Sequence, residues 1–231
     1  MEPYVGLWLF FIYGLLGVII ETAYCSLWVN RGVLDLRMAL LYLPFNPLYG
    51  CAGVILTFAL GGLASWPILV FLAGLTICTT LEYVAAAGLE RLFGLVLWDY
   101  QDKPLNVHGR ICLQSALTWG LLSLLLIYVL DPMLGRMISA IPRPAGDIAL
   151  VVLVLLTVIS TLLTVASFYR LGRRASAPDL TREPETVGAG EPWGDRLIGR
   201  LAPDPVLFRT FSHANLILRY QAARASSGEH T

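Results

Sequence analysis

Charge is scarce in this chain, and lysine is nearly absent from it. Only 14% of the 231 residues are charged, whereas soluble domains carry about 25%. Lys103 is the only lysine, and the formal net charge is zero. The basic surface that a nucleic-acid-binding protein needs is therefore missing, and we expect no nucleic-acid partner. The low charge also argues against an ordinary soluble domain.

Several motifs of established chemistry are missing as well. The sequence contains no G-x-x-x-x-G-K-[ST] nucleotide loop, no G-x-S-x-G nucleophile motif and no H-E-x-x-H zinc motif. The four cysteines at positions 25, 51, 78 and 112 follow no C-x-x-C spacing, so we interpret them as small packing residues. The sequence predicts no cofactor and no metal site, and it identifies no enzyme class.

Apolar residues make up 57% of the chain and gather in five blocks. These blocks, 4–20, 47–64, 66–81, 111–130 and 148–168, are almost free of charge. A helix needs about 20 apolar residues to cross the hydrocarbon core, with a lower limit of about 17. Because backbone polar groups in lipid must pair internally, each block is expected to be helical. We predict an all-α, polytopic membrane protein with five transmembrane helices in a transmembrane domain of residues 1–172.

Basic residues are distributed unevenly between the two sides of this predicted bundle. One side carries eight of them: Arg31, Arg37, Arg91, Lys103, Arg110, Arg170, Arg173 and Arg174. The other side carries only Arg136 and Arg143. Since short basic loops stay in the cytoplasm, we predict that the N-terminus is outside and the C-terminus is cytoplasmic.

Two glutamates fall toward the cytoplasmic ends of predicted spans. Glu21 follows the first apolar block and Glu82 follows the third. A carboxylate at this depth is costly and needs a partner, for which Arg31, Arg110 and His108 are the candidates. Two structural interpretations remain open beside a functional pocket: the glutamates snorkel to the headgroups, or they form ion pairs that only support the fold.

Small residues flank both glutamates at helical spacing. Gly14, Gly17 and Glu21 recur at three- and four-residue steps, which places them on one face of a helix. A comparable stripe joins Cys78 to Glu82, and the second block contains the glycines 50, 53 and 61. Because small residues allow membrane helices to approach closely, we place both glutamates in the protein interior.

Two connecting segments carry further polar residues. The sequence "LRMALLYL" (36–43) is too short to span the bilayer, so we predict either an interfacial or re-entrant helix or a plain connector. Between spans three and four, residues 89–97 have the pattern of a short amphipathic surface helix. Asp99 and Asp102 can pair with Arg91, Lys103 or Arg110 in this segment. It is either an anchored loop or a polar lid over the glutamates.

The last part of the chain, residues 173–231, changes character. Prolines and glycines among polar residues at 175–195 indicate a flexible linker. The sequences "WGDRLIGRL" and "PVLFRTFSHANLILRYQAARA" have the pattern of short amphipathic helices. We therefore predict a cytoplasmic linker and amphipathic tail that contacts either the membrane surface or a partner.

Six short motifs resemble a known family. They are "FFIYGLLGVIIE" (10–21), "NRG" (30–32), "PFNPLYG" (44–50), "EY" (82–83), "LFG…WDY" (92–100) and "NVHGRICL" (106–113). Their order and spacing over residues 5–130 are similar to those of the bacterial ABC-transporter type IV family, labelled CmpB-like permeases. Fourteen residues fall on its pattern: Glu21, Asn30, Arg31, Gly32, Pro44, Pro47, Tyr49, Gly50, Glu82, Trp98, Asp99, Tyr100, Asn106 and Gly109.

The resemblance implies a permease subunit of a transporter in the bacterial plasma (inner) membrane. Since the chain lacks a nucleotide loop, a separate ATPase subunit is required. Five spans are few for alternating access, so a homo-oligomer is a further expectation. The candidate cytoplasm-facing polar cavity comprises Glu21, Asn30, Arg31, Asn46, Tyr49, Glu82, Trp98, Asp99, Tyr100, Asn106, His108 and Arg110.

Two other functions stay open. The first is an intramembrane enzyme acting on a lipid or lipid-linked substrate, with Glu82 or His108 as general base and Asp99 as its partner; two carboxylates and a histidine can also bind a divalent cation. The second is a non-catalytic membrane scaffold or regulator, in which the buried polar groups fix helix register and the tail recruits a partner.

Overall fold

Helices form nearly all of the regular structure. The computed structural model describes residues 2–29, 32, 34, 36–175 and 193–211. Its helices are α1 (Pro3–Tyr24), α2 (Pro47–Leu60), α3 (Pro67–Phe93), α4 (Leu113–Leu125), α5 (Asp131–Ser139), α6 (Arg143–Ala175), α7 (Trp193–Leu201) and α8 (Asp204–Thr210). Two isolated β-bridges, and no strands, occur in these residues. The all-helical prediction is confirmed for the part of the chain that the structure describes.

Four helical stretches are long and apolar enough to cross a membrane. They are Pro3–Leu27, Pro67–Phe93, Leu113–Ser139 and Arg143–Leu171, and a shorter apolar helix covers Pro47–Leu63. Every predicted block is thus helical, and four of the five reach spanning length; that the shorter one also spans stays a prediction. Helix α6 exposes apolar side chains such as Val151, Leu155 and Ile159, as a lipid-facing helix does. The chain is a multi-pass membrane protein.

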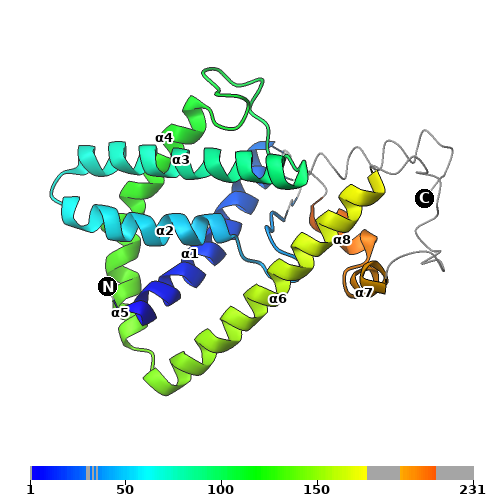
Figure 1. Cartoon of the computed structure of the whole chain (residues 1–231). Helices are drawn as coiled ribbons and strands as arrows, with labels where there is room; N and C mark the ends of the chain where they lie inside the picture. The colour runs from blue at the N-terminus through cyan, green and yellow to red at the C-terminus, as the bar shows by residue number, and fades with distance from the viewer. Residues whose placement is uncertain (1, 30–31, 33, 35, 176–192, 212–231) are drawn as a thin grey trace.

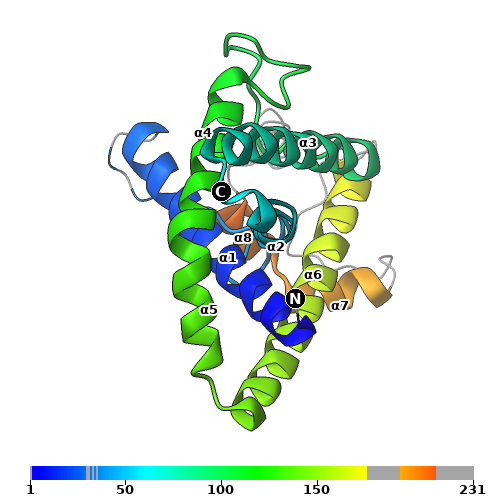
Figure 2. The same cartoon turned by 90° about the vertical axis from the view of Figure 1, so that its left-hand side faces the viewer.

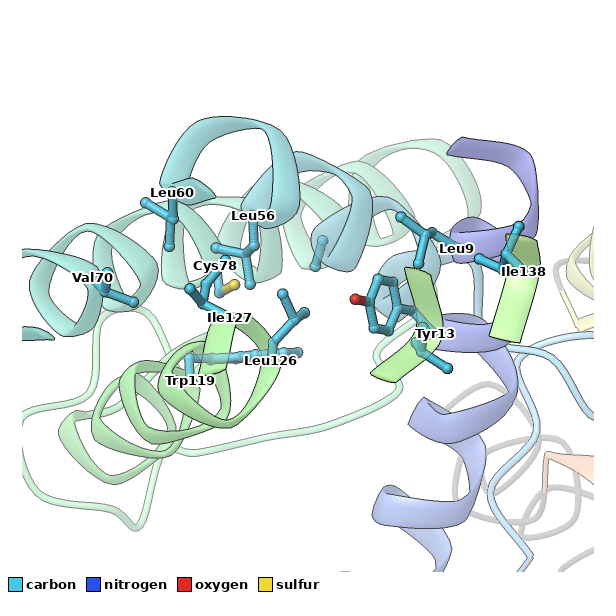
Figure 3. Close-up of a cluster of buried hydrophobic side chains, with 12 residues drawn as sticks. Leu9, Tyr13, Leu56, Leu60, Val70, Cys78, Trp119, Leu126, Ile127 and Ile138 are labelled. Carbon is cyan, nitrogen blue, oxygen red and sulfur yellow. The ribbon is translucent and has the colours of Figure 1, made fainter. Parts of the chain in front are cut away.

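The helices α1 to α5 form a bundle, and α6 runs along one side of it. Figures 1 and 2 show this arrangement, with α7 and α8 beside the C-terminal end of α6. Helix α1 packs most extensively on α2, and α3 on α4. The main apolar core lies among α1 to α5 and includes Leu9, Tyr13, Leu56, Cys78 and Trp119 (Figure 3).

Glycines bring α1 and α2 close together, as predicted. A Cβ at Gly17 would lie 2.3 Å from Cγ of Tyr49, and a Cβ at Gly53 would lie 2.3 Å from Cδ2 of Tyr13. Each aromatic ring therefore fills the space that the opposite glycine leaves. Gly61 has no neighbour within 4 Å of its Cβ position, so the packing role predicted for it is wrong.

The connector between α1 and α2 is not helical in its described residues. Residues 36–46 form turns and extended chain, so the interfacial or re-entrant helix is wrong and the plain connector fits. Leu41 is fully buried against α6, where its N–H donates to Thr164 Oγ1 (2.9 Å) and its carbonyl accepts from the Ser160 hydroxyl. Hydroxyls of α6 thus satisfy a buried peptide group.

The separate amphipathic helix predicted over residues 89–97 is also wrong. Helix α3 continues without a break to Phe93 and ends at Gly94, whose φ of 62° is left-handed. The Gly94 N–H then bonds the Glu90 carbonyl (2.9 Å), and the Leu95 N–H bonds the Leu89 carbonyl (3.3 Å). The apparent amphipathic pattern belongs to the last turns of α3, which extend beyond the apolar block.

The fourth span is longer than its apolar block. It passes through a wide π turn at Leu126–Leu130 and continues as α5 to Ser139. Pro132 has no N–H and so cannot donate to a carbonyl of the preceding turn. The N–H of Asp131 bonds the Leu126 carbonyl, five residues earlier, which is the pattern of a π turn. The loop expected after residue 130 is therefore helix, and Asp131 lies within the spanning stretch.

Candidate functional site

Glu82 occupies an interior position on α3. Its side chain is only 6% exposed. One carboxylate oxygen accepts from Trp119 Nε1 at 3.0 Å, and the other accepts from the Tyr100 hydroxyl at 3.2 Å. Trp119 lies on α4, whereas Tyr100 belongs to the 95–112 loop between α3 and α4. Three separate elements thus meet at this carboxylate.

Glu21 lies near the end of α1 and contacts the start of α2. Its carboxylate accepts from Asn46 Nδ2 at 3.0 Å. Asn46 also caps α2, since its Oδ1 accepts from the Leu48 N–H at 3.0 Å. Its own N–H bonds the Gly14 carbonyl at 3.0 Å. One asparagine therefore fixes the beginning of α2 relative to both α1 and Glu21.

Tyr49, in the first turn of α2, packs between α1 and α4. It contacts Gly17 of α1, and its ring centroid lies 5.0 Å from that of Trp119. Trp119 in turn donates to Glu82, and Asn46, which precedes α2, donates to Glu21. Tyr49 therefore lies between the groups that bind the two glutamates. We use the name polar cluster for Glu21, Asn46, Tyr49, Glu82, Tyr100 and Trp119.

The 95–112 loop holds its shape through hydrogen bonds among its own residues. Trp98 Nε1 donates to the Arg110 carbonyl (2.9 Å), and Asp99 Oδ1 accepts from the Gln101 N–H (2.9 Å). Asn106 Nδ2 donates to the Lys103 carbonyl at 2.9 Å. Trp98, Asp99 and Asn106 therefore build the loop rather than contact either glutamate.

Gly109 closes this loop against its first residues. It has a left-handed φ of 68°, and a Cβ there would lie 2.7 Å from Asp99 Oδ1. Its carbonyl accepts from the Tyr100 N–H at 2.8 Å. A residue other than glycine would be strained at this φ and would also collide with the aspartate, so the position that holds Tyr100 in place requires glycine.

Tyr100 is the residue that connects the loop to Glu82. Burial raises the pKa of the Tyr100 hydroxyl, and the nearby Glu82 charge acts in the same direction. The hydroxyl therefore stays protonated at neutral pH and donates to the carboxylate.

Arg110 and His108 form a second group, away from the polar cluster. Arg110 Nη2 binds Glu90 Oε2 at 2.6 Å, and its Nη1 donates to the Tyr83 hydroxyl at 3.0 Å. That hydroxyl also lies 3.0 Å from His108 Nδ1. The Glu90 carboxylate raises the pKa of Arg110, so the guanidinium remains charged. The expected pairing of Arg110 with Glu21, Glu82 or an aspartate is wrong, because Glu90 is nearer.

The remaining predicted residues are placed as follows. Asn30 and Arg31 lie outside the described residues. His108 and Asp99 make their hydrogen bonds with Tyr83 and Gln101, so the base and partner required by the enzyme alternative are not paired. No group of three or more His, Cys, Asp or Glu side chains suited to a metal ion occurs in the described residues.

Sequence reasoning missed one buried contact and one half-buried contact. Trp119 lies in the apolar block 111–130, although Ser115, Trp119 and Ser123 recur at four-residue steps and mark a polar stripe on α4. Asp131 directly follows that block, and its carboxylate accepts from the Tyr13 hydroxyl and from Thr57 Oγ1 (2.8 Å). An acid inside a helical apolar stretch was the available signal for Asp131.

A small cavity lies beside the polar cluster. Its volume is about 50 Å³, and side chains of α1, α2 and the fourth span line it. Tyr49 and Trp119 belong to the lining, whereas Glu21 and Glu82 do not. Leucine is the commonest lining residue and no charged side chain belongs to the wall, so the cavity is largely apolar and the carboxylates lie outside it.

Comparison with known proteins gives one match. The model of the family described as "Putative ABC-transporter type IV" matches residues 8–165. No curated protein and no solved structure matches the chain. The matched range contains the polar cluster and the 95–112 loop, and it ends before α7 and α8.

Proposed function

The chain belongs to the ABC-transporter type IV family, and from this premise we propose that it is the membrane subunit of a transporter. In this proposal the polar cluster binds the substrate, and the 95–112 loop covers it through Tyr100. Asn30, Arg31, Trp98, Asp99, Asn106, His108 and Arg110 complete or support the covering side. The site opens toward the cytoplasm, with the N-terminus outside and the C-terminus inside.

One observation carries the proposal: the hydrogen bonds to Glu82 come from neutral donors. Trp119 and Tyr100 bind its two oxygens. Within the described residues no lysine or arginine forms an ion pair with Glu82, because Arg110 is engaged with Glu90. An aspartate at the centre of a spanning helix costs about 2.5–3.5 kcal/mol on insertion scales, and Glu82, nearer the end of its span, bears a smaller cost of the same kind. Because no cationic side chain balances this carboxylate within the described residues, we propose that a cationic group of the substrate binds to it.

The proposal implies partners. The chain contains no nucleotide loop, so ATP hydrolysis belongs to a separate subunit. Four long helices and one shorter one are few for alternating access, so a second copy of the chain completes the pathway. The assembly lies in the plasma membrane in this proposal, and the distribution of basic residues supports an orientation with the polar cluster on the cytoplasmic side.

The experiment compares Glu82→Gln with Glu90→Gln. Both residues lie on α3, but Glu90 pairs with Arg110 at the surface. The purified protein in lipid nanodiscs is screened by thermal shift against methylammonium, choline and spermidine. We expect at least one cation to raise the melting temperature of the wild type and of Glu90→Gln but not of Glu82→Gln. Glutamine keeps an acceptor oxygen for Trp119 Nε1, and its amide N–H can donate to the Tyr100 hydroxyl oxygen, so the fold is retained.

Flux then tests transport itself. The cation that binds is followed in cells that supply the separate ATPase subunit, and flux is expected with the wild type and with Glu90→Gln but not with Glu82→Gln. If none of the cations stabilises the wild type, or if Glu82→Gln responds as the wild type does, the proposed cation site is wrong.

A further inference from the structure

Helix α7 has an apolar stripe that nothing in the described protein covers. Trp193, Leu197 and Leu201 lie at four-residue steps and are 74%, 47% and 51% exposed. Side chains at this spacing lie above one another on one helix face. The inward face is different, since a Cβ at Gly199 would lie 2.4 Å from an Arg170 guanidinium nitrogen.

Two arginines accompany the stripe. Arg196 and Arg200 are exposed, and each precedes one of the two leucines. Their positions, one turn apart, place both cations along one border of the apolar stripe. A face that combines tryptophan, leucine and arginine in this way is suited to the boundary between headgroups and acyl chains.

Arg170 sets the position of α7 along the membrane normal. It is 3% exposed and lies one residue before the end of the spanning stretch Arg143–Leu171. Its guanidinium donates to the Ala202 carbonyl (3.3 Å) and pairs with Asp204. The end of α7 is therefore held at the level where α6 leaves the hydrocarbon core. Figures 1 and 2 both show α7 beside α6, on the side away from α3 and α4.

We propose that the exposed face of α7 binds the surface of an anionic leaflet, with Trp193, Leu197 and Leu201 at the acyl boundary and Arg196 and Arg200 on lipid phosphates. Charge complementarity supports this partner, because the cytoplasmic leaflet is negative and α7 lies on the side that carries most of the basic residues.

This lipid contact reinforces the packing of α8. Leu207 and Phe211 are buried in a cluster with Phe168, Leu171 and Leu41. Leu41 belongs to the connector that leads to Asn46. The membrane surface thus stabilises the unit that holds this connector in place, independently of whether the polar cluster binds a substrate.

The test measures the depth of α7 in the full-length protein. A fluorophore is attached to Leu197→Cys, or to Asp195→Cys as the control on a less exposed position of the same helix. The native cysteines are replaced, Cys112 by serine because it caps α4. Quenching by spin-labelled lipid is compared in nanodiscs of phosphatidylcholine alone and in nanodiscs that also contain phosphatidylglycerol.

We expect strong quenching at position 197 in the anionic nanodiscs and weak quenching at position 195. Each arginine near an anionic surface contributes about fivefold, so Arg196→Gln with Arg200→Gln is expected to weaken docking about 25-fold. The proposal would be overturned if quenching by lipid depended neither on lipid charge nor on the two arginines. Strong quenching by aqueous iodide instead of lipid would also overturn it, and would favour a soluble partner. Hydrogen exchange of residues 193–201 in the unmutated chain, slower in anionic nanodiscs, provides a label-free check.

Discussion

The ion pair between Arg170 and Asp204 is the most informative place to perturb the fold. The two side chains are only 4% and 8% exposed, and the pair joins α6 to the start of α8. Removing one partner of a buried pair leaves an uncompensated charge, which typically costs about 3–5 kcal/mol. Asp204→Ala should therefore weaken the docking of α7 and α8 by at least about 3 kcal/mol, on the order of 100-fold in the docking equilibrium.

Hydrogen exchange of residues 193–211 in nanodiscs measures this change directly. Opening of the docked unit exposes these amides, so their exchange should accelerate on the order of 100-fold. Arg209→Gln is the control. Like Asp204→Ala it removes one charge from α8, but this charge is on an exposed side chain in the last turn. We expect that control to stay within about fivefold of the wild type.

A double variant separates charge burial from packing. Arg170→Met with Asp204→Leu removes both charges and keeps the side chains apolar, so docking should be largely restored. If Asp204→Ala accelerates exchange no more than Arg209→Gln does, the pair is not the tie that holds α8, and the reasoning from burial fails.

Three further variants, one of them with a matched control, test the polar cluster and the helix contacts by thermal unfolding in nanodiscs. Trp119→Phe removes the Nε1 donor to Glu82 and should cost about 1–3 kcal/mol, and a melting temperature equal to that of the wild type would argue against the bond. Gly17→Ala places a methyl group 2.3 Å from Cγ of Tyr49 and should cost about 1–3 kcal/mol, whereas Gly61→Ala, with open space around it, should be neutral. Burial raises the pKa of Tyr100 above its ordinary value of 10.0, so above pH 10 the unfolded state loses this proton while the folded state keeps it. The stability contributed by Tyr100 is thus complete below pH 10 and falls above it. Tyr100→Phe should therefore flatten the decline of the melting temperature between pH 10 and pH 11. An unchanged slope would show that Tyr100 is not buried.

The helical blocks could be read from the sequence because lipid imposes a local requirement. Runs such as 66–81 need no partner in the chain to become helical, since each backbone group bonds within its own helix. The ends were harder to predict. Helix α3 continues through Glu90 to Phe93, and the fourth span continues through Asp131, because helix formation extends beyond the apolar block that reveals it.

The partners of the acids were harder still. Glu82 is buried and accepts from Trp119 and Tyr100 rather than from the cations that charge alone favours, and Glu21, which is half-buried, accepts from Asn46. Arg110 illustrates the reason. It belongs to the same loop as Tyr100, yet its side chain binds Glu90 and the Tyr83 hydroxyl, whereas the Tyr100 hydroxyl binds Glu82.

The sequence by itself determined that this is a helical membrane protein, where its apolar segments lie, and that glycines such as Gly17 and Gly53 leave room for a neighbouring helix. These properties depend on hydropathy and on spacing along one helix. Only the tertiary structure decided which donors meet Glu82, that Tyr13 and Thr57 bind Asp131, and that Arg170 holds α8. Such pairs join residues far apart in the chain, and their geometry follows from how the helices pack, which no local pattern encodes.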